Sequence, residues 1–519
     1  MRRHNHSLAL VGILFYGCLV RAYGLFEPWA SDHLGTGGAR FSLHALNFVR
    51  YGYLATGFRP IMDAGWIAPG AYRLYTKHPP LLSILVSLSF RLLGVHEWSA
   101  RLVPIIFSTG TLLLLYWLAR RLWSPHIALL TIGFAATMPI GAYYDQHIDV
   151  HGALVTFGVL LAVCFYWLYL QRSHSRYLMG IAGGLLIAGL SDWVGFYIVF
   201  LLACHHLIYG RPRQDWRFWL LVLACGLLLL ALIQYITGLD AFIQGFLFRA
   251  GSRASDTDPS QTYTMFQWIR RMGGRLVVSY TTPVLVLGVL WGVHQTFRSL
   301  QEKRLAEDTS FVLLLLAFAA MVMLIGRQAA WIHDFLVRYF IPGLALAAGW
   351  TTDRLSHFFA RRTRWYRLAS LAVAGLLVIL AANAASTTIM RHQRHFNPIT
   401  WAEFGKAIAQ NTEFDAEVLT SARVSRQLEY YADRKLRGEI RSHTQFEAAL
   451  LSCTGDCRYF FVPLDFPTYP ERPNLSIIPL NIVNSQAYRE LLTYLHSRYE
   501  TNTGDRYLMF RLDHPLNRE

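Results

Sequence analysis

Three aspartates stand where apolar segments of this sequence give way to polar loops. Asp32 lies in a long polar stretch, residues 26–80, and Asp145 and Asp149 belong to the short polar segment 145–151. A carboxylate in such a position can take the proton of an attacking hydroxyl as a general base. Each of these aspartates can equally be a hydrated acid at the end of a helix. We therefore take Asp32 as the first candidate base, with Asp145 and Asp149 as alternatives or as groups that orient an acceptor.

Cationic groups occur in the same loops. Lys77 and His78 precede a double proline, whose fixed backbone holds them at the start of the apolar segment 79–94. Arg338 falls just inside a later apolar segment, where an ionised side chain is costly and indicates a function. With Arg40, these residues are candidates for holding a lipid-linked phosphate and stabilising it as a leaving group. Further cations, which can instead extend to lipid headgroups, are Arg249, Arg253, Arg327 and His333.

A histidine-containing motif offers a second chemistry. His147, Asp149 and His151 alternate in the sequence, and on a helix the two histidines share a face. With Asp149 they form a candidate site for a divalent metal ion. The sequence offers no evident fourth ligand, so we predict no metal and keep these residues as alternative ligands. No phosphate-binding Gly-Lys-Ser loop and no dinucleotide-binding glycine motif occurs, which argues against a nucleotide as the direct donor.

The composition indicates a membrane protein whose helices position these loops. Of 519 residues, 54% are hydrophobic and only 15% are charged, well below the charged fraction of soluble domains. We predict about eleven membrane-spanning helices. The first, 8–20, is an uncleaved signal-anchor, because no small-residue cleavage site follows it. The others lie near 101–119, 126–144, 151–170, 177–191, 193–209, 217–236, 276–297, 310–326, 335–352 and 367–388.

The loops between these segments alternate in charge. Lys and Arg collect in one set of loops, whereas the acids and the long loops belong to the other. The positive-inside rule therefore places the N-terminus in the cytoplasm and the acidic loops outside. It also accounts for the net charge of +16 without binding of nucleic acid. Segment 79–94 is short for a span and would invert this bias, so we predict an interfacial helix there.

The composition changes near residue 390. We predict a transmembrane domain over 1–390 and a small soluble extracytoplasmic α/β domain over 391–519. Within the second, a helix is predicted around 401–410 and strands over 417–420 and 459–463. Cys453 and Cys457 lie in this part without a further Cys or His pair nearby, which argues against zinc. A disulfide between them is compatible with an extracytoplasmic location.

Several motifs carry a family resemblance. They are Tyr75-Thr-Lys-His-Pro-Pro-Leu81, Glu97-Trp-Ser-Ala-Arg-Leu-Val-Pro104 and Leu118-Ala-Arg-Arg-Leu-Trp123, which follow a signal-anchor and a long external loop. In this order they resemble bacterial glycosyltransferase family 39, which is similar to protein O-mannosyltransferases and to the lipid A aminoarabinose transferase, all of the GT-C fold. The resemblance covers residues 8–210 and continues loosely through Tyr430-Tyr431-Ala-Asp-Arg434. It implies transfer of a sugar from a polyprenyl-phosphate donor to an acceptor on the outer face of a membrane.

The sequence departs from the family pattern at the acids. The resemblance implies an Asp-Glu pair at the start of a helix that ends in a glycine, here Gly52. The place of that pair falls near Ala39-Arg40, and Asp32 is about seven residues too early. The usual acid of the second loop falls nearer Gly152 than Asp149. His78 occupies the place where the family commonly has Lys.

We therefore expect a mainly α, polytopic membrane protein of GT-C type that acts as an inverting glycosyltransferase in the bacterial inner membrane. Its expected partners are a polyprenyl-phosphate sugar donor, membrane lipid and an acceptor that is a lipid, a glycan or a protein. No cofactor is firmly implied, and a divalent metal stays an alternative. Two rival hypotheses remain. A lipid or sugar transporter would show paired repeats and midplane charges, and a non-catalytic binder of lipid-linked sugar would explain the displaced acids.

Overall fold

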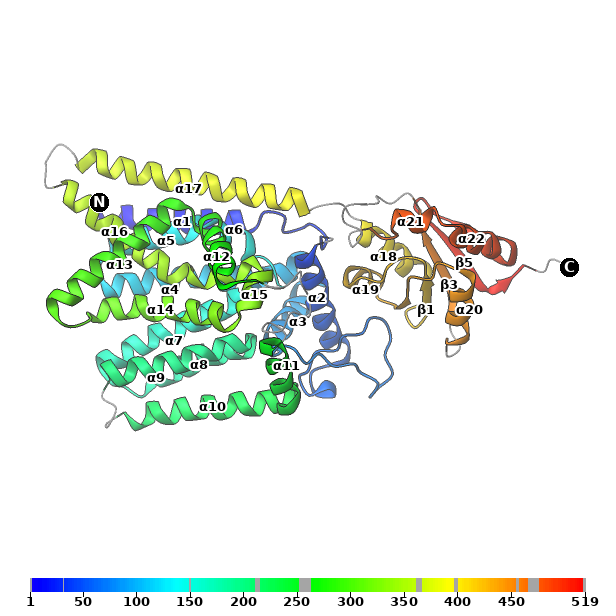
Figure 1. Cartoon of the computed structure of the whole chain (residues 1–519), viewed down its shortest axis with the longest axis horizontal. Coiled ribbons are helices and arrows are strands. Elements are labelled where there is room, and N and C mark those ends of the chain that lie inside the picture. The colour runs from blue at the N-terminus through cyan, green and yellow to red at the C-terminus, as the bar shows by residue number, and fades with distance from the viewer. Residues whose placement is uncertain are drawn as a thin grey trace. The chain divides into compact units, whose positions relative to one another are not determined.

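The chain forms two compact units, each of which draws on segments far apart in the sequence. The helical unit comprises 1–25, 76–82 and 101–391, and the mixed unit comprises 26–75, 83–100 and 392–519. The computed structural model in Figure 1 describes residues 2–30, 32–148, 151–210, 215–251, 263–360, 366–395, 400–453, 457–464 and 476–516. The predicted domain boundary after residue 390 stays a prediction. The chain leaves the helical unit for the last time after residue 391 and continues in the mixed unit from residue 392.

Apolar helices build the helical unit. In an apolar surrounding, a helix satisfies all of its backbone groups within one segment, which favours this structure for Leu-, Val- and Ala-rich stretches. The helices are α1 (Arg2–Arg21), α4 (Glu97–Leu122), α5 (Pro125–Thr137), α6 (Pro139–Tyr144), α7 (Gly152–Arg172), α8 (Arg176–Ser191), α9 (Tyr197–Tyr209), α10 (Trp216–Ile236), α11 (Leu239–Gly251), α12 (Met265–Tyr280), α13 (Thr282–Glu302), α14 (Glu307–Ile325), α15 (Arg327–Ile332), α16 (Ile341–Ala360) and α17 (Tyr366–His395). Two short 3-10 helices, η2 (Trp193–Phe196) and η3 (Asp334–Phe340), lead into α9 and α16.

Several of these helices can cross a membrane. Among the described residues, five are long and apolar enough, and α12 with α13 makes a sixth candidate that is bent by 110°. Shorter apolar helices include α5, α8 and the pair η2–α9. The protein is thus a multi-pass membrane protein, and the number of about eleven spans stays a prediction.

Helix α10 presents a lipid-facing side. It lies along one edge of the helical unit, opposite α17 (Figure 1). Its exposed leucines recur every three or four residues and so share one face. They are Leu220, Leu223, Leu227 and Leu230. In a membrane protein, such an exposed apolar face contacts lipid.

Helices α7 and α8 pack closely as a hairpin. Gly158 and Gly184 lie at their contact, where a Cβ atom on Gly158 would come within 2.6 Å of the backbone oxygen of Gly184. Small residues at such a contact let two backbones approach each other. The pairing places His151, which precedes α7, beside Ser191, which ends α8. Polar residues from both loops therefore lie at one end of the hairpin.

The mixed unit contains a five-stranded sheet with the order β2-β1-β3-β5-β4. Strands β1 (Glu417–Thr420), β2 (Lys435–Arg437) and β3 (Cys457–Pro463) are parallel, whereas β5 (Tyr507–Pro515) is antiparallel to β3 and β4 (Tyr499–Thr503). Its helices are α18 (Thr400–Asn411), α19 (Arg426–Ala432), α20 (His443–Leu451), α21 (Leu480–Val483) and α22 (Gln486–Arg498). The predicted helix at 401–410 and both predicted strands are confirmed.

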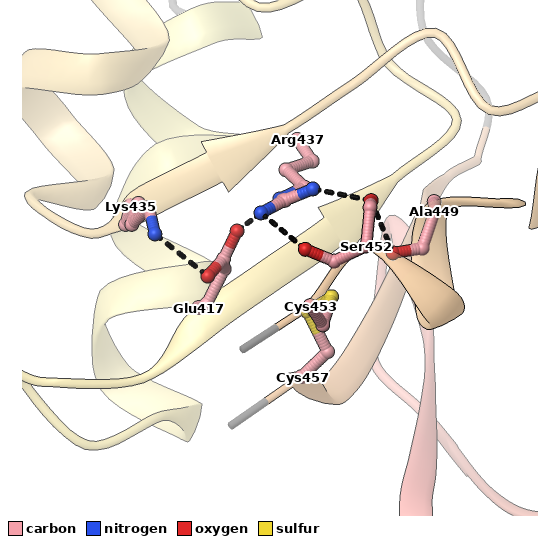
Figure 2. Close-up of a disulfide and its surroundings, with 7 residues drawn as sticks. All are labelled: Glu417, Lys435, Arg437, Ala449, Ser452, Cys453 and Cys457. Atoms are coloured by element: carbon pink, nitrogen blue, oxygen red, sulfur yellow. Dashed lines mark hydrogen bonds and ion pairs between the residues drawn. A yellow bond between two sulfur atoms is a disulfide. The ribbon is translucent and has the colours of Figure 1, made fainter. Parts of the chain in front are cut away.

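A disulfide lies at the start of β3, the central strand of this sheet. Figure 2 shows the bond between Cys453 and Cys457, the first residue of β3. Beside it, the buried carboxylate of Glu417 on β1 accepts from Lys435 at 2.8 Å and pairs with Arg437, both on β2. Arg437 also donates to the backbone oxygen of Ser452 at 3.1 Å. The structure thus joins the two cysteines in the disulfide that the sequence made plausible.

One longer helix lies in the predicted first external loop, and another follows that loop. α2 (His33–Tyr51) ends at Gly52, whose φ of +77° is a left-handed conformation that favours glycine. This bears out the helix end that the family resemblance implied. α3 (Leu81–Leu93) confirms a helix within 79–94. Its interfacial position stays a prediction.

Candidate functional site

The arginine centre of the helical unit consists of Arg21, Asp145 and Arg338. Asp145 follows the short helix α6, and its two carboxylate oxygens face different guanidiniums. Arg21 Nε lies 3.0 Å from Oδ2, and Arg338 Nη2 donates to Oδ1. Ser108 Oγ also donates to Oδ2. All three charged side chains are buried, and two positive charges against one negative charge leave an excess positive charge.

The arginine centre keeps Asp145 ionised. Burial by itself would raise the pKa of this carboxyl, but Arg338 and Arg21 outweigh burial and lower the pKa below its usual value. A carboxylate with a lowered pKa and both oxygens engaged is a poor proton acceptor. Asp145 and Arg338, which the sequence suggests as a base and a phosphate ligand respectively, therefore form one ion pair. In this ion pair the Asp145 carboxylate holds the Arg338 guanidinium in place.

The start of α7 lies close to the Arg338 guanidinium and limits its position. A Cβ atom on Gly152, the first residue of α7, would lie 2.4 Å from Arg338 Nη1. Nη1 is also within 3.4 Å of Thr156 Oγ1, one turn further along α7. The start of α7 and the carboxylate of Asp145 thus define one position for the guanidinium.

The histidine cluster, His78, His151 and Asp192, comes from three loops of the same unit. The donor atoms of the three side chains all lie within 4.8 Å of one another. His78 Nδ1 lies 3.5 Å from Asp192 Oδ1, and the rings of His78 and His151 are 4.9 Å apart. Burial, assisted by His78, lowers the pKa of His151 to about 4. His151 is therefore neutral at physiological pH.

Backbone contacts hold the segment that carries Lys77 and His78. Trp193 Nε1 in η2 donates to the backbone oxygen of Lys77 at 2.8 Å, and Thr237 Oγ1 donates to that of Thr76 at 2.8 Å. The side chain of Lys77 is exposed. The loop is thus anchored through its backbone, which leaves the charged side chain facing outward.

Asp32 has a structural role in the mixed unit. It is the N-cap of α2, and its side chain accepts from the backbone N–H of Gly35 at 2.8 Å. An N-cap carboxylate satisfies one of the free N–H groups of the first turn. Arg40 lies half-buried on the same helix. The cap is compatible with a second role for Asp32, because a carboxylate has lone pairs beyond those that one N–H uses.

Helix α19 holds the segment around Asp32 and was not singled out as part of the site from the sequence. Gln427 Nε2 donates to the backbone oxygen of Ala30 at 2.8 Å. Tyr431 OH donates to Glu97 Oε1 at 2.7 Å and accepts from the backbone N–H of Trp29 at 2.6 Å. The contacts at Trp29 and Ala30 fix the chain just before Asp32. In the sequence, the motif Tyr430–Arg434 was the feature that could have indicated that α19 contacts this segment.

The motif around residue 149 does not form one cluster in the part of the chain that the structure describes. His147 packs against the ring of Tyr143, with centroids 4.9 Å apart, whereas His151 faces His78. Asp149 lies outside the described residues. Of the further cations, Arg327 begins α15, His333 stacks on Phe335, Arg249 lies on α11, and Arg253 is outside the described residues.

Comparison with known proteins shows which family and which fold this chain resembles. Residues 77–236 match the family described as dolichyl-phosphate-mannose-protein mannosyltransferase. The structure matches ArnT from Cupriavidus metallidurans bound to undecaprenyl phosphate, with a TM-score of 0.62, 13% identity and coverage of 96% of this chain and 97% of that one. The chain has the fold of the GT-C glycosyltransferases, and the family match over residues 77–236 indicates the same class of enzyme.

A second solved structure shares the fold of this glycosyltransferase. Archaeal oligosaccharyltransferase AglB from Archaeoglobus fulgidus, in complex with an inhibitory peptide and a dolichol-phosphate, matches with a TM-score of 0.56 and 13% identity. The match covers 99% of this chain and 75% of that one. A comparison of the sequence with curated proteins finds no match. The expected GT-C fold and the glycosyltransferase class are thus confirmed.

Proposed function

We propose that this glycosyltransferase moves a sugar from a polyprenyl-phosphate-linked donor to an acceptor on the extracytoplasmic face of a bacterial inner membrane, with inversion at the sugar. The observation that carries the proposal is the arginine centre with its excess positive charge, because cleavage of such a donor releases an anionic lipid phosphate. The solved structures of ArnT with undecaprenyl phosphate and of AglB with dolichol-phosphate support a lipid phosphate as ligand.

The proposed reaction is a single displacement. An acceptor oxygen attacks the anomeric carbon of the sugar and forms the new glycosidic bond, and the bond from that carbon to the phosphate oxygen breaks. The bonding electrons leave with the lipid phosphate, and a carboxylate takes the proton of the acceptor. Lys77, His78, Arg40 and Arg338 are the proposed cations that bind the phosphate and stabilise its negative charge.

Asp32 is the proposed base. Asp145 is less suited, because Arg21 and Arg338 already engage its two oxygens and lower its pKa. Asp149 remains the alternative in the second external loop. Asp32 belongs to a segment that α19 fixes at Ala30 and Trp29, so its position is well defined within the mixed unit.

The proposed topology follows from charge and redox chemistry. The arginine centre and the histidine cluster lie in loops of the acid-bearing set, which the positive-inside rule places opposite the cytoplasm. The disulfide between Cys453 and Cys457 supports the same side for the C-terminal segment, because such bonds persist in oxidising compartments. The N-terminus is then cytoplasmic.

The test uses the full chain in nanodiscs with radiolabelled polyprenyl-phosphate sugars and native membrane extract as acceptor source. Asp32→Asn removes the proposed base and keeps the helix cap, because Asn caps a helix about as well as Asp. We expect it to lower kcat about 10²- to 10⁴-fold with unchanged thermal stability. Asp63→Asn is the matched control, since Asp63 lies in the same loop and pairs with the exposed Arg73.

Two outcomes would contradict the proposal. If wild type binds the donor and never transfers its sugar with any extract, the non-catalytic hypothesis is correct. If Asp32→Asn keeps wild-type kcat, Asp32 is not the base. Lys77→Met should raise the KM for the donor about 10- to 100-fold, the loss expected for one charge-assisted hydrogen bond.

A further inference from the structure

We infer that Arg172, Arg176 and Arg217 together bind the headgroup of one anionic phospholipid. These loop arginines are the last residue of α7, the first of α8 and the second of α10. Helix α7 begins beside the arginine centre and is 21 residues long, so its other end lies about 30 Å away from that centre. The inference concerns lipid binding alone and does not depend on the proposed glycosyl transfer.

Two of the loop arginines meet at one hydroxyl group. Arg172 Nη1 donates to Tyr177 OH at 3.3 Å, and Arg176 Nη2 donates to the same oxygen at 3.1 Å. Because a guanidinium only donates, the phenol accepts both bonds and keeps its own proton for a further acceptor. Arg217 reaches the same loop, where its Nη1 donates to Ser175 Oγ. Several hydrogen-bond donors of three helices thus gather around residues 172–177.

The positive charge of this loop is not neutralised by an acid. In the part of the chain that the structure describes, no salt bridge joins an acid to any of the loop arginines. Asp215, which precedes α10, instead accepts from Tyr169 OH at 3.1 Å and lies 3.2 Å from His206 Nε2. Like charges held close together repel each other, and a bound anion removes this cost. Phosphate is the best match, because the planar guanidinium donates two parallel hydrogen bonds to its oxygens.

Exposed apolar surface continues from the loop arginines along two helices. On α10, Leu220 follows Arg217 by three residues and begins the lipid-facing leucines of that helix. On α8, Met179 follows Arg176 by three residues and Leu186 lies about two turns further on, and they are 73% and 42% exposed. Helices α8 and α10 also contact each other. A phosphate held by the arginines therefore has apolar surface beside it for acyl chains, which favours a lipid over a free phosphate ion.

The predicted topology is consistent with an anionic lipid. The loop between α7 and α8 belongs to the set rich in Lys and Arg, which the positive-inside rule places in the cytoplasm. Basic sites between membrane helices on that side bind headgroups such as that of cardiolipin, which carries two phosphates. The competing explanation is that each arginine extends separately to the surrounding headgroups without forming one site.

The experiment measures lipid binding by native mass spectrometry of the delipidated full chain in detergent. Cardiolipin is the probe, and phosphatidylcholine is the reference lipid without net charge. We expect about one tightly bound cardiolipin per chain, with an affinity about five- to tenfold lower in Arg172→Gln, in Arg176→Gln and in Arg217→Gln. Tyr177→Phe removes only the hydroxyl group and should lower the affinity about threefold.

The control is Arg298→Gln, which also removes one positive charge from the predicted cytoplasmic side but takes it from a pair with Glu302. We expect it to bind cardiolipin as wild type does. An equal loss in this control would show that only general charge matters and would overturn the inference. Equal binding of phosphatidylcholine by wild type, or unchanged affinity in all folded arginine variants, would do the same. Displacement of cardiolipin by millimolar inorganic phosphate would identify a free-ion site instead. Gel filtration and thermal unfolding without lipid show which variants are folded.

Discussion

Replacing Asp145 by asparagine tests whether this residue holds the arginine centre together or takes a proton from substrate. The substitution keeps the shape of the side chain and removes its charge. Arg21 and Arg338, which are 1% and 2% exposed, then remain as two buried like charges. Breaking a buried ion pair by removing one partner costs about 3–5 kcal/mol. We therefore expect Asp145→Asn to destabilise the helical unit by that amount and to lower the apparent Tm on the order of 5–10 °C.

The pH dependence of this effect follows from the lowered pKa of Asp145. A carboxyl whose pKa is lower in the folded chain stabilises the fold above its unfolded value, about 3.9 for Asp. It loses that contribution as the pH falls through the folded pKa. The stability difference between wild type and Asp145→Asn should thus be constant from neutral pH down to about pH 5 and shrink only at more acidic pH.

The assay follows thermal unfolding of the detergent-solubilised chain by tryptophan fluorescence, together with the half-life at a fixed temperature because unfolding of such proteins is often irreversible. Glu302→Gln is the control, since Glu302 and its partner Arg298 are both exposed and loss of their ion pair should cost no more than about 1 kcal/mol. An Asp145→Asn protein as stable as wild type but unable to transfer sugar would refute the structural role and identify Asp145 as the base.

Two further predictions concern a close contact and a covalent link. Gly152→Ala places a methyl group against the guanidinium of Arg338 and should lower sugar transfer at least about tenfold, measured in the nanodisc assay, at a stability cost of about 1–3 kcal/mol. Gly226→Ala on α10, where a Cβ atom meets nothing within 4 Å, should leave transfer unchanged, and equal loss in both would show that the contact is irrelevant. Cys453→Ser should destabilise the sheet by about 2 kcal/mol, the entropic value for so short a loop, seen as faster hydrogen exchange in β3. Unchanged exchange there would show that the disulfide leaves sheet stability unaffected.

The sequence predicts those features that depend on local pattern. The strand at Glu417–Thr420 and the helix at Leu81–Leu93 follow from short apolar runs with clear ends. The N-cap role of Asp32 could have been recognised, because Asp before a helix start is a common signal. The glycines that follow it, Gly35 to Gly38, instead suggest a loop and hide the helical pattern of α2.

Pairs that join distant segments could not be predicted in this way. Arg21 lies 124 residues from Asp145 in the sequence, and Arg338 lies 193 residues from it. Periodicity describes neighbours along one element and carries no information on which loop ends meet. For the same reason His151 was grouped with His147, its neighbour on a helix face, and Asp192 was not chosen at all.

The mixed unit has a consequence for the order in which the protein matures. Residues 26–75 leave the ribosome early, but Tyr431 and Gln427, which fix the segment around Asp32, are made about 400 residues after their partners Trp29 and Ala30. At about 5–20 residues per second, the wait is on the order of tens of seconds. During that time the membrane helices can insert and pair while the segment around Asp32 still lacks its partners. A chain cut short before α19 would lack Tyr431 and Gln427, the residues of α19 that hold the segment around Asp32.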